Sequence, residues 1–135
     1  MNAPLASIHG DLPPASISRR LLAQISRRYG VPAAVGAAVW GVGCKYGPFP
    51  GGGTAISALV PLAYDPRRAA FFRGELLAAL GILDRGDIDL PRLRGSWAGA
   101  MGQTQFMPSS YLQYAVDFDG DGRRDIWNTP ADVFA

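Results

Sequence analysis

Cysteine is almost absent from this sequence of 135 residues: Cys44 stands alone, which excludes an internal disulfide framework and a cysteine metal cluster. Long apolar runs are absent as well. No stretch approaches the roughly 20 apolar residues of a transmembrane helix, so we expect no membrane span. Residues Met1 to Pro14 lack the basic flank and apolar run of a signal peptide. We therefore expect no export signal, and a cytoplasmic protein if the reading frame is complete.

An excess of charge of one sign is also missing. The chain has 13 basic and 11 acidic residues, which gives a net charge of +2. The arginines occur as pairs scattered along the chain, an arrangement that favours solvated helix faces over a nucleic-acid partner. With 48% hydrophobic and 18% charged residues, the composition is that of an ordinary globular domain with one core.

The first half of the chain shows helical spacing after a flexible leader at residues 1–15. One helix carries Leu21, Leu22 and Ile25 and ends at Gly30. A second helix begins at Pro32, and its buried row is expected to include the apolar residues Val35, Val39 and Val42 and to continue at position 43.

Two further helices are expected before residue 90. Thr54 can cap a short helix that Pro61 kinks or ends, after a loop at residues 47–53. The next helix should begin at Asp65 and Pro66 and end near Gly86, with an apolar face of Phe72, Leu76, Leu77, Leu80 and Leu83. Because no convincing alternating strand pattern appears, we predict a mainly α fold.

Residues 95–108 combine small residues with two amides, which indicates close backbone packing beside a polar cleft. A short helix capped by Ser109 or Ser110 then leads into an acidic loop. Its residues at loop positions 1, 3, 5 and 9 are Asp117, Asp119, Asp121 and Asp125, and position 6 is a glycine, which is the EF-hand order.

We therefore predict a structural Ca²⁺ site in this loop. The carbonyl of Arg123 would supply a further oxygen, and Asp132 can close the site from a longer loop, because Asn128 replaces the usual bidentate Glu. The alternative is an acidic turn capped by its own amides. Four acids this close would repel one another strongly without a cation.

Residues 95–127, which read GSWAGAMGQTQFMPSSYLQYAVDFDGDGRRDIW, resemble the signature of the membrane-bound lytic murein transglycosylase B family. Residues 29–32 and 62–76 are similar to that family too, so the resemblance covers about residues 17–135. It implies a lysozyme-like α-helical fold in which residues 16–135 form a partial catalytic domain, truncated at its C-terminus. It also implies the periplasm or cell envelope as location and peptidoglycan glycan strands as partner.

Members of this family cleave the β-1,4 bond between N-acetylmuramic acid and N-acetylglucosamine without water and leave a 1,6-anhydro end. A single Glu acts first as acid and then as base. In the family motif Trp-Gly-x-Glu-Ser/Thr-x-Tyr-Gly, this chain reads WGVGCKYG from Trp40, with Gly43 in place of the acid. We expect cleavage to be slowed by at least about 10²–10⁴-fold.

The missing acid has three explanations: a degraded homologue, a truncated gene or sequence error, or a displaced acid. Glu75 is the only glutamate available for the last, although its helix position suits a packing or salt-bridge partner better. The function expected from the resemblance is an impaired lytic transglycosylase. The alternatives are a non-catalytic peptidoglycan-binding module and, more remotely, a calcium-binding structural protein unrelated to glycans.

Four further residues match site positions of the family. Ser96 corresponds to a serine that hydrogen-bonds the catalytic carboxylate, Gln105 and Phe106 correspond to substrate-cleft residues, and Tyr46 lies near the glycan. Each also has a structural interpretation, Ser96 as a helix cap and the two aromatic residues as core. The tryptophans, Trp40, Trp97 and Trp127, are expected in the core rather than as sugar platforms.

Overall fold

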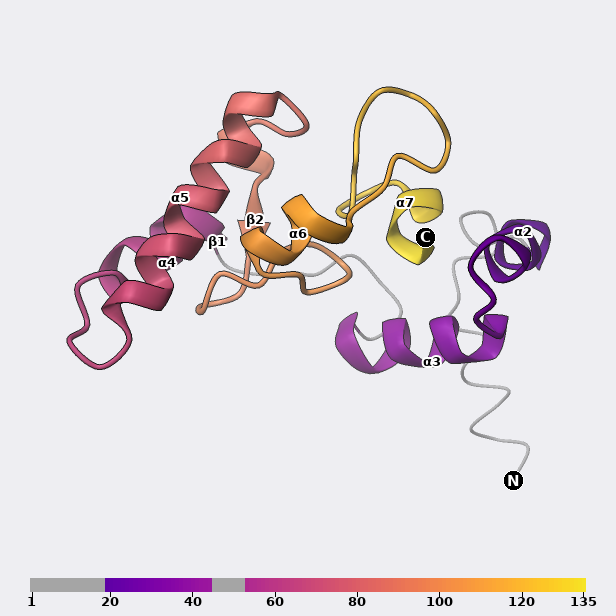
Figure 1. Cartoon of the computed structure of the whole chain (residues 1–135), viewed down its shortest axis with the longest axis horizontal. Coiled ribbons are helices and arrows are strands. Elements are labelled where there is room, and N and C mark those ends of the chain that lie inside the picture. The colour runs from indigo at the N-terminus through magenta and orange to yellow at the C-terminus, as the bar shows by residue number, and fades with distance from the viewer. Residues whose placement is uncertain (1–18, 45–52) are drawn as a thin grey trace.

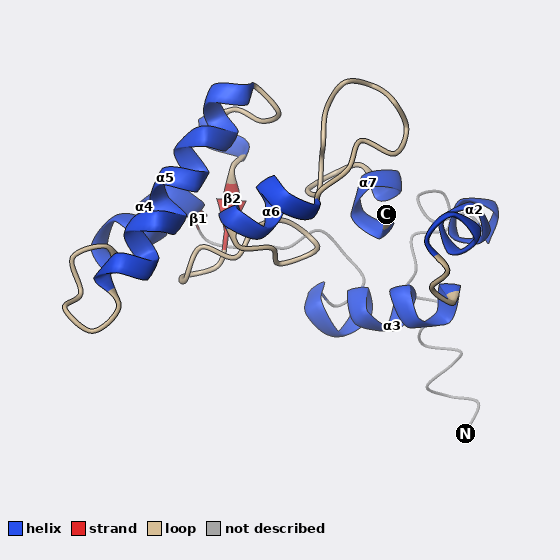
Figure 2. Ribbon diagram, viewed as in Figure 1, coloured by secondary structure: helices blue, strands red, loops and turns tan. Residues whose placement is uncertain are grey.

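The structure is a computed structural model that describes residues 19–44 and 53–135. Its helices are α2 (Arg19–Tyr29), α3 (Ala33–Cys44), α4 (Ala55–Leu62), α5 (Ala69–Arg85), the 3₁₀-helix η1 (Leu90–Arg92), α6 (Pro108–Tyr114) and α7 (Pro130–Phe134). One antiparallel ribbon pairs β1 (Gly53–Thr54) with β2 (Arg94–Gly95). The predicted mainly α architecture is confirmed for the described residues (Figure 2). The predicted leader and Tyr46 lie outside them.

The core lies where α4, α5 and α6 meet. Figure 1 shows α4 and α5 side by side, with α6 beside α5, while α2, α3 and α7 gather at the other end of the molecule. The largest fully buried side chains are Leu59, Ile82, Leu93, Met101, Pro108, Tyr111 and Ile126. None of the described helices is long and apolar enough to cross a membrane.

Most predicted helix ends are confirmed. Gly30 (φ +72°) follows α2, and Gly86 (φ +79°) ends α5, both in the left-handed region that glycine adopts without strain. Thr54 caps α4 by accepting a hydrogen bond from the N–H of Ser57 at 3.2 Å. Pro61 lies in the last turn of α4, which ends one residue later.

The predicted start of α5 is wrong by a few residues, because the chain makes a separate turn first. The carboxylate of Asp65 accepts a hydrogen bond from the N–H of Arg67 at 2.9 Å, and the helix begins only at Ala69. An Asp that bonds to the backbone two residues ahead stabilises a turn in place of a helix N-terminus.

The predicted buried face of α3 is also wrong. Val35, Val39 and Val42 have 49%, 69% and 88% of their surface exposed, whereas Trp40 has only 6% exposed and packs its ring 5.3 Å from that of Phe134. Every residue of α3 is small or apolar, so spacing alone does not choose a face. The largest side chain turns inward and sets the orientation.

On α5 the buried face is likewise displaced from the expected leucine row. Glu75, Ala79 and Ile82 are buried, Phe72, Leu76 and Leu83 pack against the core, and Leu77 and Leu80 are 68% and 46% exposed. Packing of α4 and α6 on the same side explains this, because Ala79 lets neighbouring helices approach closely. Glu75 is buried because it has partners there.

Of the tryptophans, Trp40 and Trp127 are buried as expected, but the prediction for Trp97 is wrong. Its side chain is 80% exposed because it sits in a short turn that follows β2 and projects outward. The antiparallel register pairs Gly53 with Gly95, so this turn lies beside the start of α4.

Candidate functional site

Position 43 lies in the last turn of α3, where the structure describes the backbone. One turn earlier, the indole Nε1 of Trp40 donates a hydrogen bond of 2.8 Å to Oε1 of Gln103. This bond joins α3 to the segment of residues 95–108. The helix that carries position 43 is therefore tied to the small-residue segment that the sequence places beside a cleft.

Ser96 stands at the edge of an open cavity of about 460 Å³ between the β ribbon and α4. Its Oγ accepts hydrogen bonds from the N–H groups of Ala98 at 3.4 Å and Ala100 at 3.1 Å. These bonds close a turn, and the next helix, α6, begins only at Pro108, so the alternative role of Ser96 as a helix cap is wrong. Its role toward a carboxylate stays a prediction. Trp97 lines the same cavity.

Gln105 is the last residue of a sharp turn at residues 102–105, and Phe106 follows it. Gln105 has φ +54°, and its Nε2 donates to the carbonyl of Gly102 at 2.9 Å. A non-glycine residue in this region costs about 1–3 kcal/mol, and such strain often marks functional sites. Phe106 lines a second cavity of about 360 Å³ with Trp40 and Val39. Ser96 and Phe106 therefore line different cavities.

Gln103 is a residue that the sequence did not single out from the two amides. Its Nε2 donates to the carbonyl of Trp127 at 2.7 Å, and its backbone N–H donates to the carbonyl of Ile126 at 2.9 Å. An amide within a run of small residues was the available signal. Spacing alone could not tell which of the two amides turns inward.

The acidic loop brings four of its predicted ligands together. Asp117, Asp119, Asp121 and Asp132 each place a carboxylate oxygen within 4.8 Å of the others. Gly122, at loop position 6, has φ +88° as the motif requires. The donor set consists of hard oxygens only, which is what Ca²⁺ prefers, so the residues fit this ion.

Asp132 ties both ends of the loop to α7. Its Oδ1 accepts from the N–H of Phe118 and its Oδ2 from the N–H of Asp125, both at 2.8 Å. Only 3% of its surface is exposed. Desolvation raises the pKa of Asp132, and the charge of Asp117 adds to this, although these N–H groups act against it.

The pKa values of Asp119 and Asp117 are shifted in opposite directions. Desolvation and a hydrogen bond with Asp117 raise the pKa of Asp119. Desolvation acts the same way on Asp117, but the N–H groups of Gly122 and Gly120 outweigh it, so the pKa of Asp117 lies below its usual value. Neighbouring carboxylates whose pKa values are shifted apart repel each other when both are charged, and a bound cation would neutralise that repulsion.

Asp125 and Arg123 are placed differently. The carboxylate of Asp125 lies outside the group of four and accepts from the N–H groups of Trp127 and Asn128, at 2.9 and 3.0 Å, and from the hydroxyl of Thr129 at 3.0 Å. Arg123 donates its N–H to Asp121 at 2.9 Å. Their roles as ligands stay predictions.

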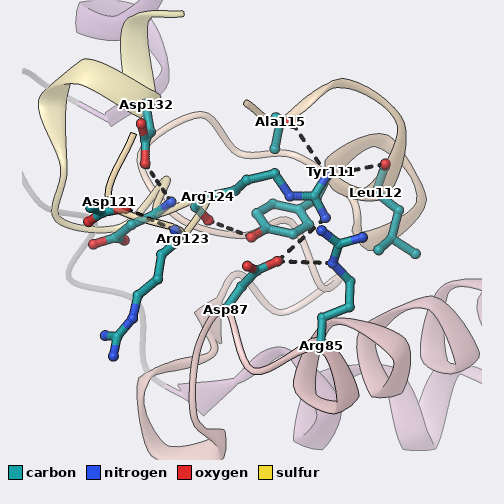
Figure 3. A network of polar contacts seen from close by, with 10 residues as sticks. Arg85, Asp87, Tyr111, Leu112, Ala115, Asp121, Arg123, Arg124 and Asp132 are labelled. Carbon is teal, nitrogen blue, oxygen red and sulfur yellow. Dashed lines mark hydrogen bonds and ion pairs between the residues drawn. The ribbon is translucent and has the colours of Figure 1, made fainter. Parts of the chain in front are cut away.

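A partly buried ion pair holds the far limb of the loop against the core (Figure 3). The guanidinium of Arg124 lies 3.4 Å from the carboxylate of Asp87 and 4.9 Å from the ring centre of Tyr111. The hydroxyl of Tyr111 donates to the carbonyl of Arg124 and also lies against Asp87. Burial and the negative charge of Asp87 raise the pKa of Tyr111.

Comparison with known proteins gives a consistent match. Residues 15–135 match the model of the family described as transglycosylase SLT domain (SLT_2). Membrane-bound lytic murein transglycosylase B of Escherichia coli (strain K12) is 47% identical over 107 residues, which are 78% of this chain and 29% of that protein.

Solved structures with the same fold include lytic transglycosylases. SltB3 from Pseudomonas aeruginosa in complex with NAG-anhNAM-pentapeptide has a TM-score of 0.82 and 44% identity over 97% of this chain and 37% of that one. The Escherichia coli lytic transglycosylase Slt35 in complex with calcium has a TM-score of 0.79 and 42% identity over 85% of this chain and 37% of that one. This chain thus spans about a third of the length of these relatives.

Proposed function

The chain belongs to the transglycosylase SLT domain family, and on that premise we propose that it binds peptidoglycan glycan strands but is impaired in cutting them. Residues 16–135 would form part of a lysozyme-like catalytic domain in the cell envelope. Membership of this family argues against the remote alternative of a calcium-binding protein unrelated to glycans. SltB3 was solved with a muropeptide containing an anhydro sugar, which supports glycan as the substrate class.

The missing acid at position 43 carries the second half of this proposal. Family chemistry uses one carboxyl group to protonate the leaving oxygen and then to accept a proton from the 6-hydroxyl of the sugar. Gly43 has no group that can do either. Loss of general acid–base catalysis alone slows such reactions by about 10²–10⁴-fold.

The surroundings of Glu75 argue against its being a displaced catalytic acid. Glu75 is 5% exposed on α5, and both of its carboxylate oxygens accept hydrogen bonds from Ser109. It does not line the cavities that contain Ser96 or Phe106. Its position therefore supports the structural role over that of a displaced catalytic group.

The decisive experiment compares the natural chain with Gly43→Glu and Gly43→Gln on purified murein sacculi. Products with 1,6-anhydro ends are measured by mass spectrometry, and retention on sacculi is measured in parallel. We expect all three chains to be retained and Gly43→Glu alone to gain activity, by about 10²-fold or more. Gln matches Glu in size without an acid, so it controls for filling the position.

The results separate the two halves of the proposal. Cleavage by the natural chain at the rate of Gly43→Glu would contradict impairment. Absence of retention in all three chains would contradict glycan binding. Retention without activity in Gly43→Glu would favour the alternative, a binding module in which more than the acid has been lost.

We further propose that Asp117, Asp119, Asp121 and Asp132 hold a structural Ca²⁺, with the carbonyl of Arg123 as an additional ligand. The convergence of four carboxylates supports this, as does the calcium complex of Slt35. The cation would neutralise the acids and fix the connection between α6 and α7. It has no place in the cleavage step.

A further inference from the structure

We propose that Gln103 is a positioning residue for α3, fixing the helix that carries position 43 against the body of the domain. The inference rests on the proposed function for its consequence, because α3 matters for catalysis only if position 43 faces glycan. The claim that Gln103 holds α3 in place does not depend on that function. Its basis is the side-chain amide of Gln103, which bridges two tryptophans from distant parts of the chain.

The amide of Gln103 is used at both ends. Oε1 accepts from the indole of Trp40 at 2.8 Å, and Nε2 donates to the carbonyl of Trp127 at 2.7 Å. The two partners also fix which way the amide points, because a flipped amide would place donor against donor and acceptor against acceptor. The backbone N–H of Gln103 donates to Ile126, so the residue itself is anchored.

The base of this bridge is rigid. A Cβ at the neighbouring Gly102 would lie 2.7 Å from the carbonyl oxygen of Ile126, so the two segments are in close backbone contact. The indole of Trp127 donates to the carbonyl of Arg94 at 3.0 Å, and Asp125 accepts the N–H of Trp127. Gln103 therefore reaches α3 from a segment that is bonded on several sides.

Within the described residues, helix α3 packs against the short helix α7 and against α2, and its three valines are half to almost fully exposed. Trp40 is its large buried side chain, and Trp40 is the residue that Gln103 holds. Position 43 follows Trp40 by three residues, which places the two on neighbouring parts of one helix face. Loss of the bridge would therefore displace position 43.

The test compares Gln103→Met with Gln113→Met in the full chain. Methionine has nearly the length of glutamine but makes no comparable hydrogen bonds, and Gln113 is an exposed residue of α6, so the same change there is a matched control. Amide hydrogen exchange is followed in α3 and, as internal reference, in α5. We expect exchange in α3 to be roughly tenfold faster in Gln103→Met, while α5 is unchanged.

A second variant, Trp40→Phe, removes the same hydrogen bond from the other side and keeps an aromatic ring beside Phe134. It should accelerate exchange in α3 as well, and combining it with Gln103→Met should add little. Unchanged exchange in α3, or equal acceleration in α3 and α5, would overturn the proposal. Unchanged exchange would mean that Gln103 does not hold α3 in place. Equal acceleration would mean that the substitution destabilises the whole domain.

Consequences for glycan are measured on the Gly43→Glu background. Gln103→Met should lower kcat for anhydro product formation by a larger factor than it raises KM, because it displaces the acid, while Gln103 is only one of the residues that line the cavity of Phe106. If kcat is unchanged despite faster exchange in α3, positioning of site position 43 is contradicted. If Gly43→Glu is itself inactive, the missing acid does not by itself explain the impairment, and the exchange data alone decide whether Gln103 holds α3.

Discussion

Glu75 and Ser109 form a two-point contact between α5 and the start of α6. The N–H of Ser109 donates to Oε2 at 2.9 Å, and its hydroxyl donates to Oε1 at 2.6 Å. Helix α6 has no side-chain cap from its own N-cap residue, Met107. A carboxylate from a neighbouring helix satisfies the free N–H instead and complements the helix dipole.

Glu75→Gln should destabilise the fold by about 1–3 kcal/mol, because both hydrogen bonds from Ser109 lose the negative charge that strengthens them. Urea unfolding measures this change. Retention on sacculi, and the activity of Gly43→Glu, should be unaffected. Residual cleavage by the natural chain that disappears in Glu75→Gln would instead identify Glu75 as the displaced acid.

Gly99→Ala should destabilise the domain by about 2–4 kcal/mol, because the left-handed backbone conformation and the steric crowding by the new Cβ both add to the cost. Gly99 has φ +90°, and a Cβ there would lie 2.6 Å from Cδ2 of Leu59, a fully buried core residue. Gly74→Ala on the exposed side of α5 meets nothing within 4 Å and should stabilise by about 0.5–1 kcal/mol. Thermal unfolding of both variants tests the pair, and equal effects would refute the packing argument.

Local signals in the sequence were sufficient for much of the fold. Gly30 and Gly86 end their helices and Thr54 caps the next, because each of these features depends only on residues a few positions away. The buried faces of the helices were harder to predict. On α3 every residue is small or apolar, and on α5 a buried acid replaces part of the leucine row, since its partner Ser109 is 34 residues away.

In the candidate site, too, features that depend on nearby residues were predictable and those that depend on distant partners were not. The EF-hand order predicted three of the four converging acids by spacing, and Asp132 was proposed as the closing ligand. The spacing did not show that the carboxylate of Asp125 turns to cap the following residues. Gln103 was passed over because its partners, Trp40 and Trp127, come from opposite ends of the chain.

The ion pair of Asp87 predicts a pH dependence of stability. Burial alone would raise its pKa, but contacts with Tyr111 and Arg85 and the charge of Arg124 outweigh it, so the folded pKa lies below the unfolded one. This stabilisation is therefore complete above the ordinary Asp value near pH 4 and is lost as the pH falls through the folded pKa.

Asp87→Asn should cost about 2 kcal/mol at pH 7, because Arg124 keeps its charge while losing its partner. The difference from the natural chain should shrink below about pH 4, where the natural Asp87 also becomes neutral. Unfolding curves of both chains between about pH 3 and pH 7, a range that includes the ordinary pKa of Asp, measure this difference in stability. A difference that stays constant over the range would contradict the ion-pair explanation.

Calcium should raise the melting temperature of the chain, and a chelator should reverse the effect. At a concentration 100 times the dissociation constant, a ligand bound only to the folded state adds about 2.7 kcal/mol. Asp121→Asn should weaken this response, because it removes a ligand from the exposed part of the loop. The control is Asp84→Asn, an exposed acid of α5, which should respond as the natural chain does. No calcium response in the natural chain would refute the site.

Trp97→Ala should weaken retention on murein sacculi with little change in stability. Trp97 is 80% exposed and lines the cavity beside Ser96, so it has an open aromatic face for a sugar and contributes little to the core. Leu77→Ala, which removes a 68% exposed apolar side chain from α5, serves as control. Equal retention of the two variants would leave Trp97 without a role in glycan binding.

The carboxylate of Asp132 has a consequence for how an ion would enter the acidic loop. Its hydrogen bonds to the N–H groups of Phe118 and Asp125 connect the two limbs of the loop on either side of the acids. Because these bonds do not depend on a cation, little chain should need to be ordered when an ion binds, which keeps the entropic penalty of binding small. Calcium uptake should therefore be accompanied by only a slight change in far-ultraviolet circular dichroism.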